Sequence, residues 1–500
     1  MKIALVSLTG ELGSLSIQSL SSYLKKNGHE PVMFFVLDPP NKNNLEDMSK
    51  VLKVLDISLV GINLGTADFI NAIKITESIK SGMSGASRTV IWGGPHPTIS
   101  PEQSLKFADI VCLGEGEEAL LELMNRMEAG HKTKGIKNMW FRDRRNDVRG
   151  LEENLDRYPF PNYGFEGHYA IIGDSCRRID KRIIDKYGQD DVYCILTSRG
   201  CPYSCTYCYN NYRKKLYQDK GRYVRFRSPE NVIAELKEAK KKFPKLRLIK
   251  FWDDLFLAHP QIDMLAGLYK KEIGISFDCM STPVYITKEK ILMLKDAGLH
   301  SIHIGIQSGS ERVNKEIYRR QVPNNLLLEK VKLLNRLGIA TRYDIIFNNP
   351  YETREDILET INLLTCFPKP FSIQGFSLAF FPGTEIYEMA IRDGLIELTG
   401  DKTSTEKDFF KYIHQENTEN PIYKNRFSST HKTYLNKITM LTPFLSRKKI
   451  EYLTRNENSL TRVYASAIYH KNYVWRLGLS RFLGRHKKIK NIGKKILGRE

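Results

Sequence analysis

The chain has 500 residues, of which 41% are hydrophobic and 27% charged, so it has enough apolar material for roughly two to four packed domains. Its formal charge of +20 is typical of a protein that binds nucleic acid or membranes, but residues 431–500 hold 17 Lys and Arg against 3 Glu, which leaves only +6 for the rest. No stretch approaches about 18 consecutive apolar residues and no signal-peptide pattern opens the chain, so we expect a cytoplasmic protein whose thiols stay reduced.

Strand-like and helix-like patterns alternate through residues 1–134. The strand-like runs are continuously apolar, which is typical of parallel strands covered on both faces by helices. We therefore predict a doubly wound, Rossmann-like α/β domain over this range. The predicted strands are residues 2–8, 31–37, 59–65, 89–94 and 109–116.

Glycine-containing loops follow four of these strands, with the sequences SLTGELG, NLGTAD, GGPHPT and GEGEE. In a doubly wound sheet, ligands bind outside the carboxyl ends of the strands, and glycine lets the backbone come close to a bulky ligand. A single such loop is also an ordinary turn, but four loops at one edge favour a ligand site. The candidate ligand residues are Thr9, Gly65, Thr66, Gly93, Gly94, Pro95, His96, Gly114, Glu115 and Gly116.

Residues 135–190 are irregular and include a proline-rich stretch, and we interpret them as a linker. A second alternating series occupies residues 191–390, with helix ends marked by signals such as Thr287 at a start and Gly298 at an end. Six βα units at a fairly regular spacing favour a partial, TIM-like (β/α)6 barrel. The predicted strands are residues 192–198, 247–254, 274–281, 300–309, 342–350 and 372–383.

Strand signals fade in residues 391–500, where we predict a basic, mainly helical C-terminal region. Near its end, Leu483, Ile489, Ile492 and Ile496 are spaced as on one face of a helix. Such a helix would suit an anionic membrane surface, and a solvated basic tail is the alternative interpretation.

Three of the eight cysteines, Cys201, Cys205 and Cys208, fall within eight positions just after the first strand of the second series. Three thiolates from one tight loop can hold three irons of a 4Fe-4S cluster and leave the fourth iron open. A structural zinc ion normally takes four protein ligands, and the nearest further candidate, Cys194, lies inside the predicted strand. In a reducing compartment, this spacing favours metal binding over disulfide formation.

The spacing C-x3-C-x-aromatic-C, with Tyr207 as the aromatic residue, resembles the signature of the radical S-adenosylmethionine (SAM) superfamily. The resemblance implies that the open iron chelates SAM and that one electron from the cluster cleaves SAM to a 5′-deoxyadenosyl radical. It also implies a set of SAM contacts after the barrel strands. These contacts are Tyr207, Asp253, Asp254, Ser281, Gln307 and Ser308.

Two of the family-like segments depart from the expected pattern. In GIQSGS, Gln307 replaces an acid, which keeps a hydrogen-bond acceptor but loses the negative charge and puts the role of this position in doubt. In FNNPYETRED, Asn348 and Asn349 stand where small residues are expected. The segments FWDDLF and FFPGTEIY follow the family pattern more closely.

Ahead of such a barrel, the doubly wound domain with its GGPHPT and GEGEEAL loops resembles the cobalamin-binding domain of class B radical SAM enzymes. The resemblance implies that the candidate residues on the glycine loops contact cobalamin. The D-x-H-x-x-G motif of other cobalamin domains is missing, since His29 lies in NGHEP and His96 in GPHPT. We therefore expect no His from that motif beneath the cobalt.

The two resemblances together cover roughly residues 1–390 and imply cobalamin-dependent methylation of an unactivated carbon. One alternative is a related radical SAM enzyme, with or without cobalamin, that catalyses a cyclisation or rearrangement. The alternative of another class is a basic, metal-stabilised RNA- or membrane-binding protein. The expected partners are a small-molecule or lipid-linked substrate and an external electron donor such as flavodoxin or ferredoxin. Peripheral membrane contact through the basic C-terminus is an option, no nucleic acid is expected, and no catalytic residue is assigned.

Overall fold

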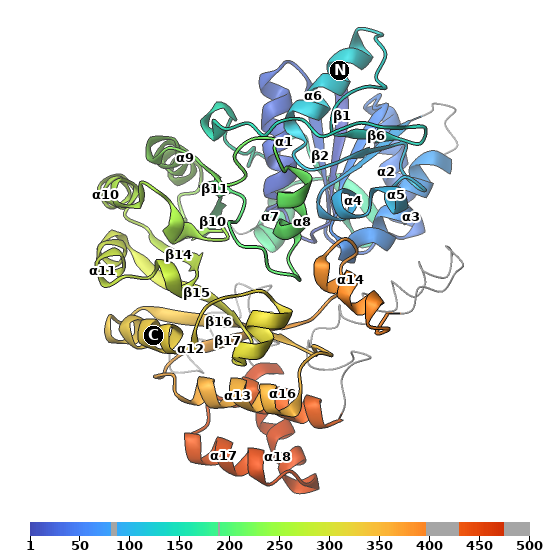
Figure 1. The fold of residues 1–500 in the computed structure, drawn as a ribbon. Coiled ribbons are helices and arrows are strands. Elements are labelled where there is room, and N and C mark those ends of the chain that lie inside the picture. Colours follow the sequence, from blue (N-terminus) through green and yellow to red (C-terminus); the bar gives the residue numbers. More distant parts are fainter. Residues whose placement is uncertain (82–87, 189–190, 397–429, 475–500) are drawn as a thin grey trace. The chain divides into compact units, whose positions relative to one another are not determined.

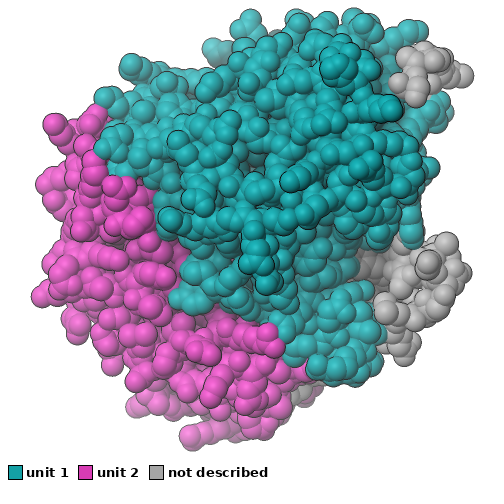
Figure 2. Space-filling view, turned by 45° about the horizontal axis from the view of Figure 1, so that its top comes forward, with its two compact units in different colours: residues 1–246, 381–396 teal, residues 247–380, 397–500 magenta. Residues whose placement is uncertain are grey.

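The structure is a computed structural model, and it describes residues 1–81, 88–188, 191–396 and 430–474. The chain forms two compact units, which Figure 2 colours separately. Unit 1 comprises Met1–Leu246 and Phe381–Ile396, and unit 2 comprises Arg247–Phe380 and Glu397–Glu500. The helix predicted around Leu483 to Ile496 lies outside the described residues. Within the described ranges, no helix is long and apolar enough to cross a bilayer.

A nine-stranded sheet forms the centre of unit 1, in the order β7-β6-β5-β4-β3-β1-β2-β8-β9 (Figure 1). In its central part β1 pairs in parallel with both β2 and β3, and β4 and β5 continue beyond β3. Every residue of β1 after Lys2 is buried, as expected for a strand covered on both faces. The parallel strands are β1 (Lys2–Ser7), β2 (Glu30–Val36), β3 (Leu59–Asn63), β4 (Thr89–Gly93), β5 (Ile110–Cys112) and β8 (Tyr169–Ile172).

Helices alternate with these strands, which confirms the predicted doubly wound α/β fold. The order of the strands reverses at β1, because β2 lies on one side of it and β3 on the other. Such a reversal opens a crevice at the carboxyl ends of the strands, where ligands bind. The helices are α1 (Leu15–Lys26), α2 (Lys42–Val54), α3 (Phe69–Ser81), α4 (Pro95–Ile99), α5 (Pro101–Ser104) and α6 (Glu117–Glu128), with a 3-10 turn η1 (Thr66–Asp68) before α3.

The segment interpreted as a linker, residues 135–190, instead extends this sheet at both edges. β6 (Met139–Phe141) pairs antiparallel with β5 and β7 (Arg144–Arg145) pairs with β6, while β8 joins β2 and β9 (Ser175–Arg178) pairs with β8. Strands of two to four residues carry too little periodic pattern to be recognised in the sequence.

Unit 1 continues with elements that surround the three-cysteine segment. β11 and β12 pair antiparallel, with Arg199 opposite Arg225. Cys208 is the N-cap residue of α8. The elements are η2 (Leu155–Arg157), α7 (Lys181–Tyr187), β10 (Val192–Ile195), β11 (Ser198–Arg199), α8 (Tyr209–Leu216), β12 (Arg225–Phe226), α9 (Pro229–Lys242) and, after the chain returns from unit 2, α14 (Glu385–Arg392).

Five parallel strands pair in chain order in unit 2, from β13 to β17. Thr287 caps α11 and Gly298 ends it with a φ of +117°, as the sequence predicted. The strands are β13 (Leu248–Phe251), β14 (Ser276–Ser281), β15 (Leu299–Gln307), β16 (Ala340–Phe347) and β17 (Ser372–Ser377). The elements between them are η3 (Phe256–Ala258), α10 (Ile262–Glu272), η4 (Pro283–Tyr285), α11 (Lys288–Ala297), η5 (Val313–Ile317), α12 (Asn324–Arg336) and α13 (Arg354–Thr365).

The described part of the C-terminal region is helical, as predicted. Residues 391–396 belong to unit 1 and residues 430–474 to unit 2, where the first helix, α16, packs against α13. The elements are α16 (Thr430–Leu441), α17 (Arg447–Arg455), α18 (Ser459–Tyr469) and the π-helical turn η6 (His470–Val474).

Candidate functional site

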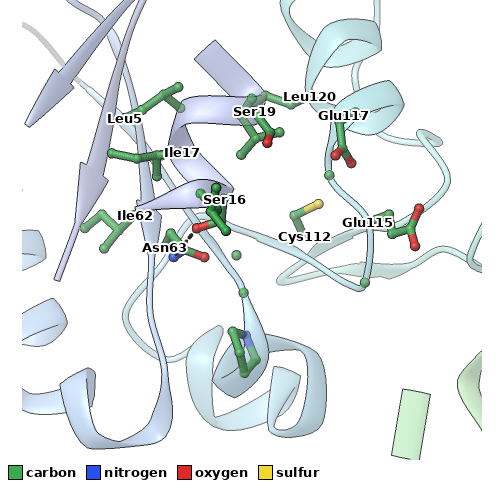
Figure 3. Close-up of a pocket in the computed structure, with 18 of the residues that line it drawn as sticks. Leu5, Ser16, Ile17, Ser19, Ile62, Asn63, Cys112, Glu115, Glu117 and Leu120 are labelled. Atoms are coloured by element: carbon green, nitrogen blue, oxygen red, sulfur yellow. Dashed lines mark hydrogen bonds between the residues drawn. The ribbon is translucent and has the colours of Figure 1, made fainter. Parts of the chain in front are cut away.

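A cavity of about 530 Å³ opens at the switch point of the unit 1 sheet, entirely within that unit. Figure 3 shows aliphatic side chains of Leu5, Ile17 and Ile62 on one side of it and the carboxylates of Glu115 and Glu117 on the other. A mostly apolar cavity of several hundred Å³ with a few polar groups is typical of sites for cofactors and other organic ligands. The cavity therefore lies where a doubly wound sheet binds its ligand.

Glycines form part of the wall and leave the backbone accessible. A Cβ at Gly93 would lie 3.8 Å from Cys112, and a Cβ at Gly116 would lie 3.7 Å from Cys112 and from Leu20. The protein itself therefore leaves room for a side chain at both positions. Gly94 is different, because its φ is +101° and a Cβ would lie 2.5 Å from Oδ1 of Asn63. A broad, flat ligand such as a corrin can thus come close to the backbone, and the chemistry of this wall suits the corrin of cobalamin.

The sequence-predicted cobalamin contacts divide into two groups in the structure. Four of them, Thr9, Gly65, Thr66 and His96, are not among the residues that line the cavity. They stay predictions. The other six line it, namely Gly93, Gly94, Pro95, Gly114, Glu115 and Gly116.

His96 is fully buried in the core of unit 1. Its Nδ1 lies 3.3 Å from the Thr66 hydroxyl, and its ring packs edge-on against Phe69 with the centroids 4.6 Å apart. Burial lowers the pKa of His96 to about 3, so the imidazole is neutral at physiological pH. The ring thus lies in the core and does not line the cavity, and a contact of His96 with cobalamin stays a prediction.

Cys112 lines the cavity, although no role was assigned to it from the sequence. Its thiol is buried, and burial raises its pKa to about 12. A thiolate would be a strong ligand for a metal such as cobalt, but this thiol stays protonated at neutral pH.

Residues on either side of the three cysteines form another part of the cavity wall, which was not predicted from the sequence. Leu196 and Arg199 precede the cysteines, and Tyr209 and Arg213 follow them on α8, one helical turn apart. The helical spacing of Tyr209 and Arg213 in YNNYRKKLY was the available signal, but no role was assigned to this segment from the sequence. The cavity and the cysteines thus share neighbouring elements of one unit.

A cluster of charged side chains, here called the Glu115 ion cluster, lies at this shared wall and comprises Glu115, Glu117, Arg199, Arg213 and Arg225. The Arg199 guanidinium lies 3.0 Å from the Glu115 carboxylate and 2.6 Å from that of Glu117. Arg213 lies 3.2 Å from Glu115, and Arg225 donates to both of its oxygens. Burial alone would raise the pKa of Glu115, but the three arginines hold it at about 2.

The loop that carries Glu115 is also fixed through its backbone. The Glu115 N–H donates to the Tyr217 hydroxyl at 2.8 Å, and Tyr217 directly follows α8. Gly114 has a φ of +69°, and a Cβ there would lie 1.9 Å from the Tyr217 hydroxyl oxygen. Only glycine therefore fits beside this tyrosine.

Cys201, Cys205 and Cys208 lie on the loop between β11 and α8, with Cys205 buried and the other two half-buried. The Cys208 N–H donates to the Cys205 carbonyl at 3.1 Å, and Cys208 caps α8, whose N-terminal dipole favours a thiolate. The loop is held from outside as well, since Ile386 N–H donates to the Thr206 carbonyl at 3.1 Å.

The donor chemistry of this loop, three cysteines within eight residues, fits a 4Fe-4S cluster with one open iron. Within the residues that the structure describes, no group of three or more His, Cys, Asp or Glu side chains has the arrangement of a metal site. The assignment of the three cysteines therefore rests on their residue type and spacing.

The predicted SAM contacts are distributed over both units, with Tyr207 in unit 1 and the others in unit 2. Asp253, Ser281 and Ser308 are buried at or just after the carboxyl ends of β13, β14 and β15. Asp254 is exposed. Gln307 ends β15 with a φ of +70°, at an irregularity in the pairing with β16. Carboxyl ends of barrel strands are where such folds place their reactive groups.

A buried carboxylate, Glu352, joins this edge of unit 2. Ser308 donates to it at 2.9 Å, and the Ser308 hydroxyl lies 3.3 Å from that of Thr360. Burial raises the pKa of Glu352 to about 7, although Ser308 and Lys432 favour the ionised form. Glu352 belongs to the family-like segment FNNPYETRED, and no role for it was predictable from the sequence.

The two asparagines that depart from the family pattern are buried and receive polar partners. Asn348 has a φ of +59°, its amide donates to Ser377 at 3.0 Å, and its carbonyl oxygen accepts from Asn436 at 3.2 Å. Lys432, like Asn436 a residue of α16, donates to the Asn349 carbonyl at 3.2 Å. Side chains of the C-terminal region thus contact the residues that follow the carboxyl end of β16 in unit 2.

Family models match both parts of the chain. The radical SAM superfamily model matches residues 195–364, and the B12 binding domain model matches residues 1–124. The chain contains a B12 binding domain followed by a radical SAM domain. These two domains imply a 4Fe-4S cluster, SAM and cobalamin as cofactors.

Relatives of this radical SAM protein extend over most of the chain. An uncharacterized methyltransferase of Pyrococcus horikoshii is 28% identical over 364 residues, which are 70% of this chain and 73% of the relative. The bacteriochlorophyllide d C-8(2)-methyltransferase of Chlorobaculum tepidum is 24% identical over 366 residues, 69% of this chain and 70% of that protein. The solved structure of OxsB, a cobalamin-dependent SAM radical enzyme with aqua-cobalamin and SAM bound, has a similar fold, with a TM-score of 0.66 and 18% identity over 97% of this chain and 75% of OxsB.

Proposed function

We propose that this radical SAM protein is a cobalamin-dependent methyltransferase that methylates an unactivated carbon of a small molecule. The observation that carries the proposal is the cavity at the switch point of unit 1, whose wall includes Leu196, Arg199, Tyr209 and Arg213 from either side of the three cysteines. The two relatives described as methyltransferases support the choice of the transferred group.

The chain's own residues would bind and orient cofactors that bring the reactivity. When bound, the cluster and SAM supply a carbon-centred radical and cobalamin supplies the methyl group. Cys201, Cys205 and Cys208 would hold the cluster. The glycine wall at Gly93 and Gly116 would admit the corrin, and the aliphatic wall would exclude water from it.

In unit 2, we assign SAM binding to the predicted contacts at the strand ends, with Asp253, Ser281 and Ser308 as the buried members. Glu352, with its pKa near 7, can hold or release a proton at this edge. Radical SAM enzymes act on small molecules and need a reductant. We propose a flavodoxin or ferredoxin as the electron donor.

The test uses the full chain, reconstituted anaerobically with iron and sulfide and loaded with hydroxocobalamin. After reduction and addition of SAM with a deuterated methyl group, mass spectrometry should detect 5′-deoxyadenosine and deuterated methylcobalamin. Cys205→Ala should abolish 5′-deoxyadenosine formation, whereas Cys366→Ala, the same change at an exposed cysteine of α13's C-cap, should not.

Each other outcome favours a specific alternative. If the protein forms 5′-deoxyadenosine but retains no corrinoid after gel filtration, it is a cobalamin-free radical SAM enzyme. If corrinoid is retained but never accepts the methyl group of SAM, cyclisation or rearrangement is favoured. If wild type forms no 5′-deoxyadenosine, or if Cys205→Ala forms as much as wild type, the radical chemistry itself is refuted.

A further inference from the structure

The strand before the three-cysteine loop and the helix after it each carry an arginine that contacts the same carboxylate. Arg199 lies on β11, two residues before Cys201, and Arg213 lies on α8, the helix that Cys208 caps. Both guanidinium groups contact Glu115, at 3.0 and 3.2 Å. Glu115 lies between Gly114 and Gly116 in the wall of the cavity. One side chain of the cavity wall is therefore bound to both ends of the loop.

Further contacts make this connection rigid. Arg225, on the strand paired with β11, has a side chain that is 1% exposed and donates to Glu115 as well as to the Glu152 carbonyl at 2.7 Å. Tyr217, at the C-cap of α8, accepts the Glu115 N–H. Because charge-assisted hydrogen bonds to a buried carboxylate fix both distance and direction, a displacement of the Glu115 loop must displace β11 and α8 too.

We propose that Glu115 is a positioning residue that couples cobalamin binding in the cavity to assembly of the cluster on Cys201, Cys205 and Cys208. This inference rests on the proposed function, in which cobalamin occupies the cavity. Cobalamin would fix the Glu115 loop, and the arginines would pass that constraint to the ends of the cysteine loop. By thermodynamic reciprocity, an assembled cluster then strengthens cobalamin binding by the factor by which cobalamin stabilises the cluster.

The experiment measures this factor with the full chain. Hydroxocobalamin is titrated into cluster-free protein and into protein reconstituted with iron and sulfide, and the ratio of the two dissociation constants is the coupling. For wild type we expect tighter binding to the cluster-containing form, by roughly 5-fold or more. Glu115→Gln should bring the ratio close to one, because the amide keeps the shape but cannot hold three guanidinium groups. Chelator-driven loss of iron should be slower with cobalamin in wild type but not in Glu115→Gln.

Glu118→Gln is the matched control, since Glu118 lies shortly after Glu115 in the first turn of α6, contacts Tyr23 and Arg157, and does not line the cavity. Its ratio should equal that of wild type. Arg213→Gln is a second test in case Glu115→Gln fails to fold. Arg213 is the member of the Glu115 ion cluster that lies on α8, its side chain is 17% exposed, and the ratio for this variant should also fall.

The outcomes separate the inference from the proposed function. A merely structural role would weaken cobalamin binding equally in both forms and leave the ratio unchanged in both variants, which overturns the inference. A wild-type ratio of one with normal cobalamin binding overturns it as well but leaves the proposed function standing. Failure of wild type to bind hydroxocobalamin in either form overturns both.

Discussion

Replacing Gly114 with alanine introduces a methyl group where the Tyr217 hydroxyl already lies. The new Cβ would be 1.9 Å from that oxygen and 2.7 Å from the adjoining ring carbon, and the Tyr217 side chain is buried. The ring must move, which breaks the hydrogen bond from the Glu115 N–H. We therefore expect Gly114→Ala to destabilise unit 1 and to disturb the wall of the cobalamin cavity.

Gly130→Ala is a matched control, because Gly130 has a φ of +67°, almost equal to the +69° of Gly114, but has no atom within 4 Å of an added Cβ. In both variants, placing alanine in the left-handed region lowers the free energy of unfolding by about 1 kcal/mol. Gly114→Ala adds about 1 kcal/mol for the lost hydrogen bond and about 1–3 kcal/mol for overpacking. Its free energy of unfolding should thus be lower than that of the control by about 2–4 kcal/mol.

The assay is thermal unfolding of the cobalamin-free proteins, followed by circular dichroism, together with hydroxocobalamin titration. At about 2 °C per kcal/mol for a unit of this size, Gly114→Ala should unfold at least about 4 °C below Gly130→Ala. It should also bind hydroxocobalamin more weakly, whereas Gly130→Ala should bind as wild type does. Equal unfolding temperatures of the two variants would show that Tyr217 is not fixed against Gly114 and would refute the reasoning.

Two further predictions concern other buried positions. Burial raises the pKa of Glu352 from 4.5 to about 7, so the folded state holds a proton that the unfolded state releases between these values, and stability should fall by up to about 3 kcal/mol as the pH rises through this window. Glu352→Gln should remove that dependence, and melting temperatures at pH 5 and pH 8 test it; an unchanged pH profile contradicts the assignment. Gly94→Ala, whose Cβ would lie 2.5 Å from Asn63 Oδ1, should raise the dissociation constant of hydroxocobalamin at least about tenfold, while Gly173→Ala, with a φ of +54° and open space, should leave it unchanged. Equal affinities of these two glycine variants would argue against a cavity wall at Gly94.

Features with a local physical cause were predictable from the sequence. Continuous apolar runs predicted the parallel strands of unit 1, since a strand buried on both faces has no polar side. The ends of α11 were predictable because a threonine hydroxyl and a left-handed glycine cap a helix whatever surrounds it. The spacing of Cys201, Cys205 and Cys208 indicated the cluster for the same reason, because three ligands on one loop need no tertiary information.

Features that depend on tertiary packing were not predictable. The strands β6 to β9 are too short to carry a pattern, and they form because neighbouring strands offer them a pairing edge. His96 follows a glycine loop as a ligand would, but its ring packs into the core against Phe69. Arg199 and Arg213 look like solvated surface charges in the sequence, and only the fold brings them to Glu115.

The discontinuity of unit 1 has a consequence for synthesis on the ribosome. The loop with the three cysteines is complete at Cys208, but Ile386, whose N–H binds Thr206, and Glu385, which accepts from Asn211, are translated about 180 residues later. At about 5–20 residues per second, that interval is roughly 10–40 s. During this time the nascent chain displays its cysteines without the final clamp of α14. A cluster inserted after release of the chain therefore binds to a more ordered loop than a cluster inserted during translation. Truncated forms that end before Glu385 would remain in the earlier state.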